Sequence, residues 1–338
     1  MKLKHLDYTF SQIENKKILI IGDIMLDKYI FGNVDRISPE VPIPIVEIKS
    51  EEYKLGGAAN VALNIKKLGA EPILISVIGN DTDGEILLST LYNENINNKY
   101  IITDNNRKTT CKTRIMADEH QIVRLDSEEK TIIHPYIKIQ ILNTLQSIKN
   151  DFDILLFQDY NKGLLSKQLI EEVIYFCNFH NKKILVDPKF DNFYEYKNSF
   201  LFKPNKKEFK NVILRPLDTY EQQVKECTEF MNKNNCENFV LTLGKDGMLL
   251  LEKNENRQIS VHQISTIAKK VSDVSGAGDT VIATIAVLLD TELSLYEILN
   301  IANIAAGLVV EEVGIVAITK NKLIEHVDNL IKQNYLHI

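Results

Sequence analysis

Short runs of apolar residues alternate with segments of helical periodicity along most of the chain. The runs typical of buried strands cover residues 18–21, 73–78, 154–157, 184–186 and 239–243. The segments with the apolar spacing of helices cover residues 58–68, 135–148, 166–180, 220–232, 279–289, 294–310 and 320–333. Strands separated by helices in this way are typical of a parallel sheet that is covered on both faces. The pattern therefore predicts an α/β fold with a mostly parallel central sheet.

Two stretches interrupt this alternation. The first, at about 28–55, contains several prolines and an alternating strand pattern at 43–49. The second, at about 104–126, alternates polar and apolar residues around a turn near Asp118, which predicts a β-hairpin. Ligands bind at the carboxyl ends of parallel strands, and extra strands there typically form a lid or an interface. We therefore expect one domain, residues 1–338, with a small β-sheet lid.

The composition is typical of a globular cytoplasmic protein. Hydrophobic residues make up 44% and charged residues 25% of the 338 residues, and the net charge of −6 disfavours wholesale binding to nucleic acid. The polar N-terminus lacks the apolar core of a signal peptide, and no apolar run reaches the roughly 18 residues that span a bilayer. The four cysteines lack C-x-x-C spacing, so we expect reduced, half-buried thiols. Neither nucleic acid nor a membrane is an expected partner.

The sequence VSDVSGAGDT at 271–280 carries the strongest chemical signal. Gly276 and Gly278 allow backbone N–H groups to approach an anion at the start of a helix, where the dipole also favours negative charge. Asp279 lies in the first helical turn, where the dipole is expected to keep it ionised. An ionised carboxylate there can accept a proton from an attacking hydroxyl. The alternative is a plain helix start with Ser275 as the N-cap residue.

Two other nucleotide-binding motifs do not occur in the sequence. The Walker A pattern, G-x-x-x-x-G-K followed by serine or threonine, is absent. The first predicted strand is followed by GDIML and not by the G-x-G-x-x-G fingerprint of dinucleotide-binding folds. A hydride-transfer enzyme is therefore disfavoured.

A second glycine pair, Gly56 and Gly57, opens another predicted helix. It can expose backbone N–H groups to a ligand or act as a hinge for the lid. Asn60, in the first turn, can point its amide at sugar hydroxyls. The alternative is a glycine turn that is required only for tight packing.

Several predicted strands end in polar clusters, and the carboxyl ends of parallel strands share one edge of a sheet. Asp27 follows the first strand and can accept hydrogen bonds from sugar hydroxyls. Asn205 and Glu208 lie three residues apart on one helical face and can hold hydrated Mg²⁺, which prefers few carboxylates and many waters. Further polar side chains in these clusters are Lys162, Asp187 and Lys189. The convergence of several clusters predicts a ligand site.

Two arginines lie at equal distances from the centre of the predicted hairpin. Arg114 and Arg124 are therefore expected to be cross-strand neighbours. A pair of guanidinium groups on one face suits a phosphate group. The alternative is a solvated edge strand whose charges prevent aggregation.

Together these residues resemble the ribokinase-like (PfkB) carbohydrate kinases over nearly the whole chain. GGAAN at 56–60 resembles the N-terminal signature of the family, and DVSGAGD at 273–279 resembles its C-terminal signature. The resemblance implies a three-layer sandwich with a β lid, and it implies that Asp279 is the catalytic base. By the same resemblance, the anion hole is formed by Gly276, Ala277 and Gly278.

The family resemblance also implies the cofactors, which are ATP, Mg²⁺ and a monovalent cation such as K⁺. Asn205 and Glu208 match the N-x-x-E motif that the family uses for Mg²⁺ and phosphate. The residues expected at the nucleotide are Asn205, Thr242, Gly244, Gly247, Asn303 and Gly307. Ile315 departs from the family pattern, in which threonine is common, near the expected cation site.

A narrower resemblance is to the heptose-7-phosphate kinase branch of this family. It rests on GDIMLD at 22–27, RISPEVPIP at 36–44, RLD at 124–126 and DYNKG at 159–163, together with the N-terminal signature. The branch converts D-glycero-D-manno-heptose 7-phosphate to the 1,7-bisphosphate, on the route to ADP-heptose and lipopolysaccharide core. The residues expected at this substrate are Asp27, Arg36, Gly56, Gly57, Asn60, Arg114, Arg124, Lys162, Asp187 and Lys189. Gln158 stands where a small residue is more usual.

The sequence thus predicts an ATP-dependent sugar kinase that performs only the kinase step, without a fused nucleotidyltransferase domain. One alternative is a PfkB-type kinase for fructose, ribose or a phosphorylated hexose. Another is a non-catalytic sugar-binding regulator of the same fold. Apolar side chains at Ile43, Ile45 and Ile48 would leave an exposed strand face in a monomer, so we expect a homodimer through the lid.

Overall fold

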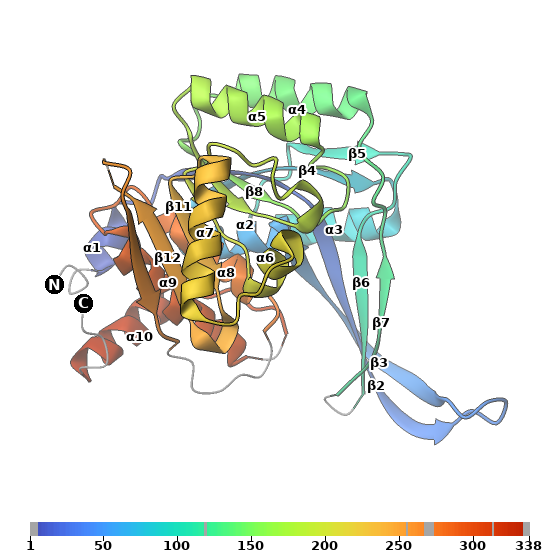
Figure 1. The fold of residues 1–338 in the computed structure, drawn as a ribbon. Helices are drawn as coiled ribbons and strands as arrows, with labels where there is room; N and C mark the ends of the chain where they lie inside the picture. Colours follow the sequence, from blue (N-terminus) through green and yellow to red (C-terminus); the bar gives the residue numbers. More distant parts are fainter. Residues whose placement is uncertain (1–5, 118–119, 255, 267–273, 313, 334–338) are drawn as a thin grey trace.

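The computed structural model describes residues 6–117, 120–254, 256–266, 274–312 and 314–333. Within these ranges, a nine-stranded sheet (sheet A) forms the centre of the molecule, and a four-stranded sheet (sheet B) projects from it (Figure 1). Sheet A contains, in spatial order, β13 (Ile259–Ile264), β12 (Met248–Lys253), β11 (Asn238–Thr242), β10 (Leu201–Phe202), β9 (Lys183–Asp187), β8 (Ile154–Gln158), β1 (Lys17–Gly22), β4 (Glu71–Gly79) and β5 (Ile101–Asp104). Its pairs are parallel from β5 to β11, whereas β12 and β13 form an antiparallel edge.

Helices cover both faces of sheet A, which gives the predicted three layers (Figure 1). One face packs against α1 (Leu6–Ser11), α2 (Ala58–Lys67), α3 (Thr82–Asn93), α8 (Ala277–Leu288), α9 (Leu295–Val310) and α10 (Lys320–Lys332). The other face packs against α4 (Pro135–Ser147), α5 (Lys167–Phe179), α6 (Lys206–Ile213) and α7 (Tyr220–Asn234). The continuous apolar run of β1 supplies both layers, because Ile18 and Ile20 join one core and Leu19 and Ile21 the other.

Sheet B contains two long strands, β2 (Ile24–Ile37) and β3 (Pro44–Gly57), and a shorter pair, β6 (Cys111–Ala117) and β7 (His120–Ser127). The long strand β2 was not predicted. Only Asp23 separates it from β1, so the chain passes from sheet A to sheet B without a loop. The hairpin of β6 and β7 is confirmed, while the predicted turn at Asp118 lies outside the described residues.

Helix α8 is buried along almost its whole length, as expected for a helix that is apolar on all sides. It packs against α2 and α9. The N-cap residue is Gly276, with a φ of 82°, and not Ser275. At the other end, the Lys16 ammonium donates to the carbonyl oxygens of Val287, at 3.0 Å, and Leu289. The core therefore fixes the helix whose first turn carries Asp279.

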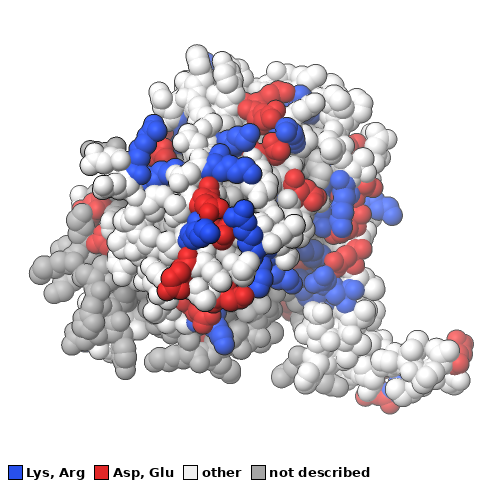
Figure 2. Space-filling model, viewed as in Figure 1, with Lys and Arg blue, Asp and Glu red and all other residues white. Residues whose placement is uncertain are grey.

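The surface of the described residues agrees with the composition. Figure 2 shows basic and acidic side chains interspersed over the viewed face. None of the helices that the structure describes combines the length and apolarity needed to cross a membrane. All four cysteines are free thiols, and they are fully buried where half-burial was expected.

Candidate active site

Polar side chains gather at the carboxyl edge of sheet A, as the sequence predicted. Asp23 follows β1, Gln158 ends β8 and Asp187 ends β9, while Lys203 follows β10 directly. These four strands are neighbours in the sheet, so their ends meet. A cavity of about 200 Å³ opens there, and it is lined by Gln158, Asp159, Tyr160, Asp187, Lys189, Lys203, Asn205, Glu208, Thr242, Gly276, Gly278 and Asp279.

The Asp279 carboxylate is buried and accepts three hydrogen bonds. Asn60 Nδ2 donates to Oδ2 at 2.8 Å. Tyr160 Oη and Gln158 Nε2 donate to Oδ1 at 2.7 Å and 3.1 Å. Burial raises the pKa of Asp279 to about 6, although the bonds from Tyr160 and Asn60 act in the opposite direction. Asp279 was expected to be ionised, and with a pKa of about 6 the carboxylate is the main form at neutral pH, although burial opposes ionisation.

The N-terminal glycine motif brings α2 against this carboxylate. Asn60 was expected to reach sugar hydroxyls, whereas its amide donates to Asp279 instead. Gly56 and Gly57 end β3, and Gly57 has a φ of 60°. A Cβ at Gly57 would lie 2.4 Å from the Asp23 carbonyl oxygen, and one at Gly56 would lie 2.0 Å from Asp27 Oδ2. Close packing therefore accounts for both glycines.

The C-terminal glycine motif opens α8 at the cavity. Gly276 adopts a left-handed conformation, and a Cβ there would lie 3.1 Å from Asn60 Nδ2. Ala277 is the first helical residue, and Gly278 follows at the cavity wall. The position of a Cβ at Gly278 is 3.7 Å from Lys203 Nζ. The positive end of the helix dipole and a buried ammonium group thus face the same space, which suits an anion.

Lys203 and Tyr160 line the cavity but were not among the predicted site residues. For Lys203 the position in the chain offered a signal. Its side chain is buried, and Nζ lies 3.1 Å from Asp187 Oδ2. The signal was its place immediately after a strand, in the same polar cluster as Asn205 and Glu208. A buried lysine is retained when a carboxylate pairs with it.

Asn205 and Glu208, the predicted Mg²⁺ pair, form a reciprocal capping box at the start of α6. Glu208 Oε2 accepts from the Asn205 backbone N–H at 3.0 Å, and Oε1 pairs with the Lys189 ammonium. Within the described residues, no three His, Cys, Asp or Glu side chains are grouped to hold a metal. This donor set does not form an all-protein cage. It fits a hydrated Mg²⁺ that shares its ligands with nucleotide phosphates and waters.

Of the other residues expected at the nucleotide, Thr242 lines the cavity, and the rest lie on elements that follow it in the chain. Thr242 ends β11, and Gly244 begins a short 3-10 turn at Gly244–Asp246. A Cβ at Gly247 would lie 1.9 Å from the Ile264 carbonyl oxygen, so this position requires glycine. Asn303 on α9 donates to the Ser265 carbonyl oxygen at 2.7 Å. The remaining expected residue, Gly307, lies on α9.

Asp187 and Lys189, which were expected at the sugar, line the cavity. Other charged side chains expected there form ion pairs on sheet B instead. Asp27 lies inside β2, and not at a strand end of sheet A, and its buried carboxylate pairs with Arg114. Arg124 is directly opposite Arg114, as predicted, but its guanidinium binds Asp126 at 2.8 Å. None of these sheet B residues lines the cavity around Asp279.

Two further basic residues were expected at the sugar, and neither lines the cavity. The Lys162 ammonium pairs with Glu128, and its backbone N–H donates to Asp23 Oδ2 at 3.2 Å. Arg36 is exposed near the outer end of β2, where it pairs in register with Ile45. Arg36 and Lys162 are therefore not part of the cavity wall around Asp279 in this structure.

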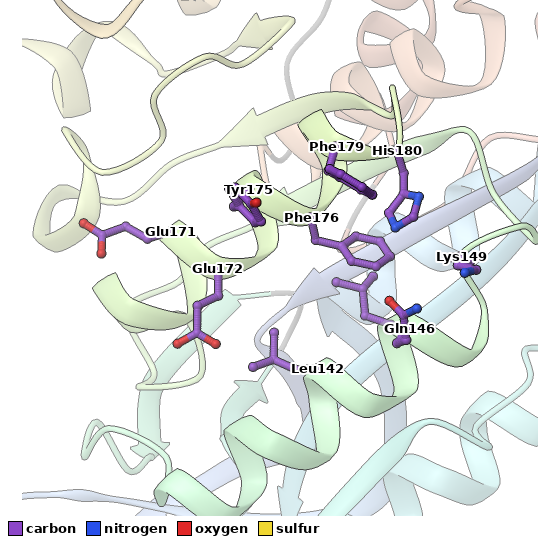
Figure 3. Close-up of a pocket in the computed structure, with 10 residues that line it drawn as sticks. Leu142, Gln146, Lys149, Glu171, Glu172, Tyr175, Phe176, Phe179 and His180 are labelled. Atoms are coloured by element: carbon purple, nitrogen blue, oxygen red, sulfur yellow. The ribbon is translucent and has the colours of Figure 1, made fainter.

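A larger hollow of about 670 Å³ lies elsewhere, between α4 and α5 (Figure 3). Leu142 and Gln146 face Phe176 and His180 across it, with Tyr175 and Phe179 at its rim (Figure 3). It shares no lining residue with the cavity around Asp279. We therefore place the candidate active site at the carboxyl edge of sheet A.

Comparison with known proteins agrees with this class of site. Residues 15–321 match the model of the pfkB family carbohydrate kinases, so the chain belongs to that family. The fold is also that of Escherichia coli phosphofructokinase-2 in complex with potassium (TM-score 0.76, 20% identity, 94% of this chain and 99% of that chain). Arabidopsis thaliana ribokinase, complexed with ribose and ATP, is similar as well (TM-score 0.71, 18% identity, 93% and 99%).

Curated relatives with greater sequence identity are called bifunctional protein HldE. The protein from Helicobacter pylori strain J99 is 38% identical over 299 residues, which is 88% of this chain. The protein from Aliarcobacter butzleri is 36% identical over 317 residues, or 94% of this chain. The chain spans 64% and 65% of the lengths of these two relatives. The matched region is the carbohydrate kinase domain.

Proposed function

We propose that this carbohydrate kinase transfers the γ-phosphoryl group of ATP to the anomeric hydroxyl of D-glycero-D-manno-heptose 7-phosphate. The observation that carries the proposal is the buried Asp279 carboxylate at the N-terminus of α8, beside Lys203 and a polar cavity. The heptose assignment rests on the sequence motifs of that branch. The relatives named HldE are longer than this chain, so the proposal concerns the kinase step alone.

In the proposed reaction, the sugar O1 attacks the γ-phosphorus in line with the bond to the β-phosphate oxygen. Asp279 accepts the O1 proton while the new O1–P bond forms and the old P–O bond breaks, so ADP leaves with the bonding electrons. The N-terminus of α8 and the Lys203 ammonium stabilise the charge on the transferred group. Tyr160 and Asn60 hold the carboxylate toward the cavity.

The proposed cation is a hydrated Mg²⁺ that arrives with ATP. Asn205 and Glu208 would hold it through water, and Lys189 fixes the Glu208 carboxylate. When bound, Mg²⁺ neutralises phosphate charge and orients the β- and γ-phosphates. A monovalent cation such as K⁺ is a further proposal, which rests on the family resemblance.

Substrate identity is tested by ADP release with Mg·ATP and a panel of sugars. The panel contains heptose 7-phosphate, unphosphorylated heptose, fructose, ribose and fructose 6-phosphate. We expect turnover with heptose 7-phosphate and a new anomeric phosphate signal in the phosphorus NMR spectrum. Turnover of a different sugar would overturn the heptose assignment but keep Asp279 as base, and silence across the panel would favour the non-catalytic regulator.

We also propose a homodimer through sheet B. Ile48 on the edge strand β3 and Ile43, immediately before that strand, are more than half exposed, at 57% and 54%. Exposed apolar side chains at the edge of a sheet favour pairing with a second copy. We expect light scattering at micromolar protein to give twice the 38.7 kDa chain mass.

In the same measurement, Ile48→Glu should shift the protein to monomers, because a buried unpaired charge is costly in an interface. Phe179→Glu is the matched control, since this residue is exposed on α5 and outside sheet B. Monomeric wild-type protein would rule the dimer out.

A further inference from the structure

The side chain of Gln158 connects two carboxylates at the active site. Its Nε2 donates to Asp279 Oδ1 at 3.1 Å and to Asp187 Oδ2 at 3.2 Å. Asp187 in turn pairs with Lys203. A chain of contacts therefore runs from the proposed base through Gln158 to the ammonium group beside the anion hole. In the sequence, Gln158 is distinguished only as a departure from the family pattern.

The hydrogen bonds determine the orientation of the carboxamide. Rotating it by half a turn would place Oε1 against two carboxylates and remove both donors. In the observed orientation, Oε1 is buried and has no hydrogen-bond partner within the described residues. A buried carbonyl without a partner is destabilising. The amide nitrogen thus donates to both carboxylates, while the amide oxygen has no partner in the described part of the chain. A residue that only filled space would not be expected to leave a buried acceptor unsatisfied.

We propose that Gln158 is a positioning residue. It holds the Asp279 carboxylate at a fixed position relative to Asp187 and Lys203, on the side of the site that suits a phosphate. The inference rests on the proposed function, because it assigns the base to Asp279. Gln158 itself does not exchange a proton. It donates a hydrogen bond to ionised Asp279, so it favours the form that can accept the proton of the attacking hydroxyl.

Several charged or titratable groups surround this contact, and they come from different elements. Tyr160 donates to the same oxygen of Asp279 as Gln158 does. The other groups that influence Asp279 or its neighbour are Asp187 on β9, Lys189 after β9, Lys203 after β10 and Glu208 on α6. Replacing Gln158 with leucine keeps a side chain of similar size but removes the donor. The charged form of Asp279 then loses one of its three hydrogen bonds, so its pKa rises above the value of about 6.

Gln158→Leu should therefore move the acidic limb of the kcat/KM profile for heptose 7-phosphate upward by about one pH unit. A second measurement needs no substrate. A further rise of the folded pKa lowers stability only where the carboxylate of the folded wild type is ionised, which is above its pKa of about 6. The urea midpoint of the variant should thus fall further below that of the wild type at pH 8 than at pH 5.

Gln223→Leu is the matched control for the urea measurement. Gln223 is also buried, but it donates to the neutral Leu217 carbonyl oxygen at 3.0 Å. The urea midpoint of this variant should therefore fall by the same amount at both pH values. If Gln158→Leu behaved like this control and left the acidic limb in place, the positioning role would be wrong. If wild-type protein turned over no sugar in the panel, the proposed function would fail, while the urea comparison would still decide whether Gln158 supports ionised Asp279.

Discussion

Asp279→Asn is expected to lower kcat by about a thousandfold, because a positioned general base contributes roughly 10²–10⁴ to such reactions. The asparagine amide is nearly the same size, and its oxygen can still accept from Asn60 or Tyr160. It cannot take the proton of the attacking hydroxyl. Steady-state kinetics with Mg·ATP and the sugar that the wild type accepts will measure the loss, and ATP affinity should change little.

Folding of this variant is not expected to suffer. The pKa of Asp279 is about 6 in the folded protein against an ordinary 3.8, so stability falls as pH rises from 3.8 through 6. Asparagine does not ionise, so the substitution removes this loss of stability. The variant should therefore unfold at the same or a higher temperature than wild type at pH 8. Asp290→Asn, after the opposite end of α8, is the matched control and should retain activity. Wild-type turnover by Asp279→Asn would mean that another group is the base.

Lys203→Met is expected to lower kcat by about 10²–10³, which is the usual cost of removing one donor that stabilises developing charge. It should also destabilise the protein by about 3 kcal/mol, because the Asp187 carboxylate then remains buried without its partner. Urea unfolding and steady-state kinetics will measure the two effects separately.

A second variant separates the catalytic role of Lys203 from its structural role. Lys203→Met combined with Asp187→Asn removes both charges of the pair, so most of the stability should return. Activity should stay low, because no ammonium faces the anion hole. Recovery of both properties in the double variant would show that Lys203 serves only as the partner of Asp187.

The features predicted correctly are those that local patterns encode. The apolar run of β1 and the apolar residues around α8 predicted that both elements are buried. A parallel sheet between helices also places the polar carboxyl ends of its strands at one edge. The pairing of Arg114 with Arg124 followed from their distances to a turn. Periodicity and turn geometry were sufficient for these elements.

The contacts around Asp279 were not predictable in the same way. Its partners Asn60, Gln158 and Tyr160 lie 219, 121 and 119 residues away in the sequence. The folded sheet and α2 bring these residues together. A contact between residues so far apart in the sequence leaves no local sequence pattern from which it could be predicted. For the same reason, the sequence did not reveal that burial raises the pKa of Asp279.

Strand β2 was missed because its start resembles a strand end. Gly22 and Asp23 suggested a loop after the first strand, whereas a single residue joins the two sheets. A Cβ at Gly22 would lie 2.2 Å from the Gln158 carbonyl oxygen, so this glycine serves the contact between β1 and β8 and not a loop.

The direct passage between the sheets has a mechanical consequence. The two long strands of sheet B join sheet A and α2 at Asp23, which precedes β2, and at Gly57, which ends β3. The Ala58 backbone N–H donates to the Asp23 carbonyl oxygen at 2.9 Å. A long flexible linker would let sheet B move independently of the helices. This connection is short and hydrogen-bonded, so we expect sheet B and α2 to move together. We therefore expect a tilt of sheet B to rotate the helix that carries Asn60. The orientation of sheet B would then alter the hydrogen bond from Asn60 to Asp279.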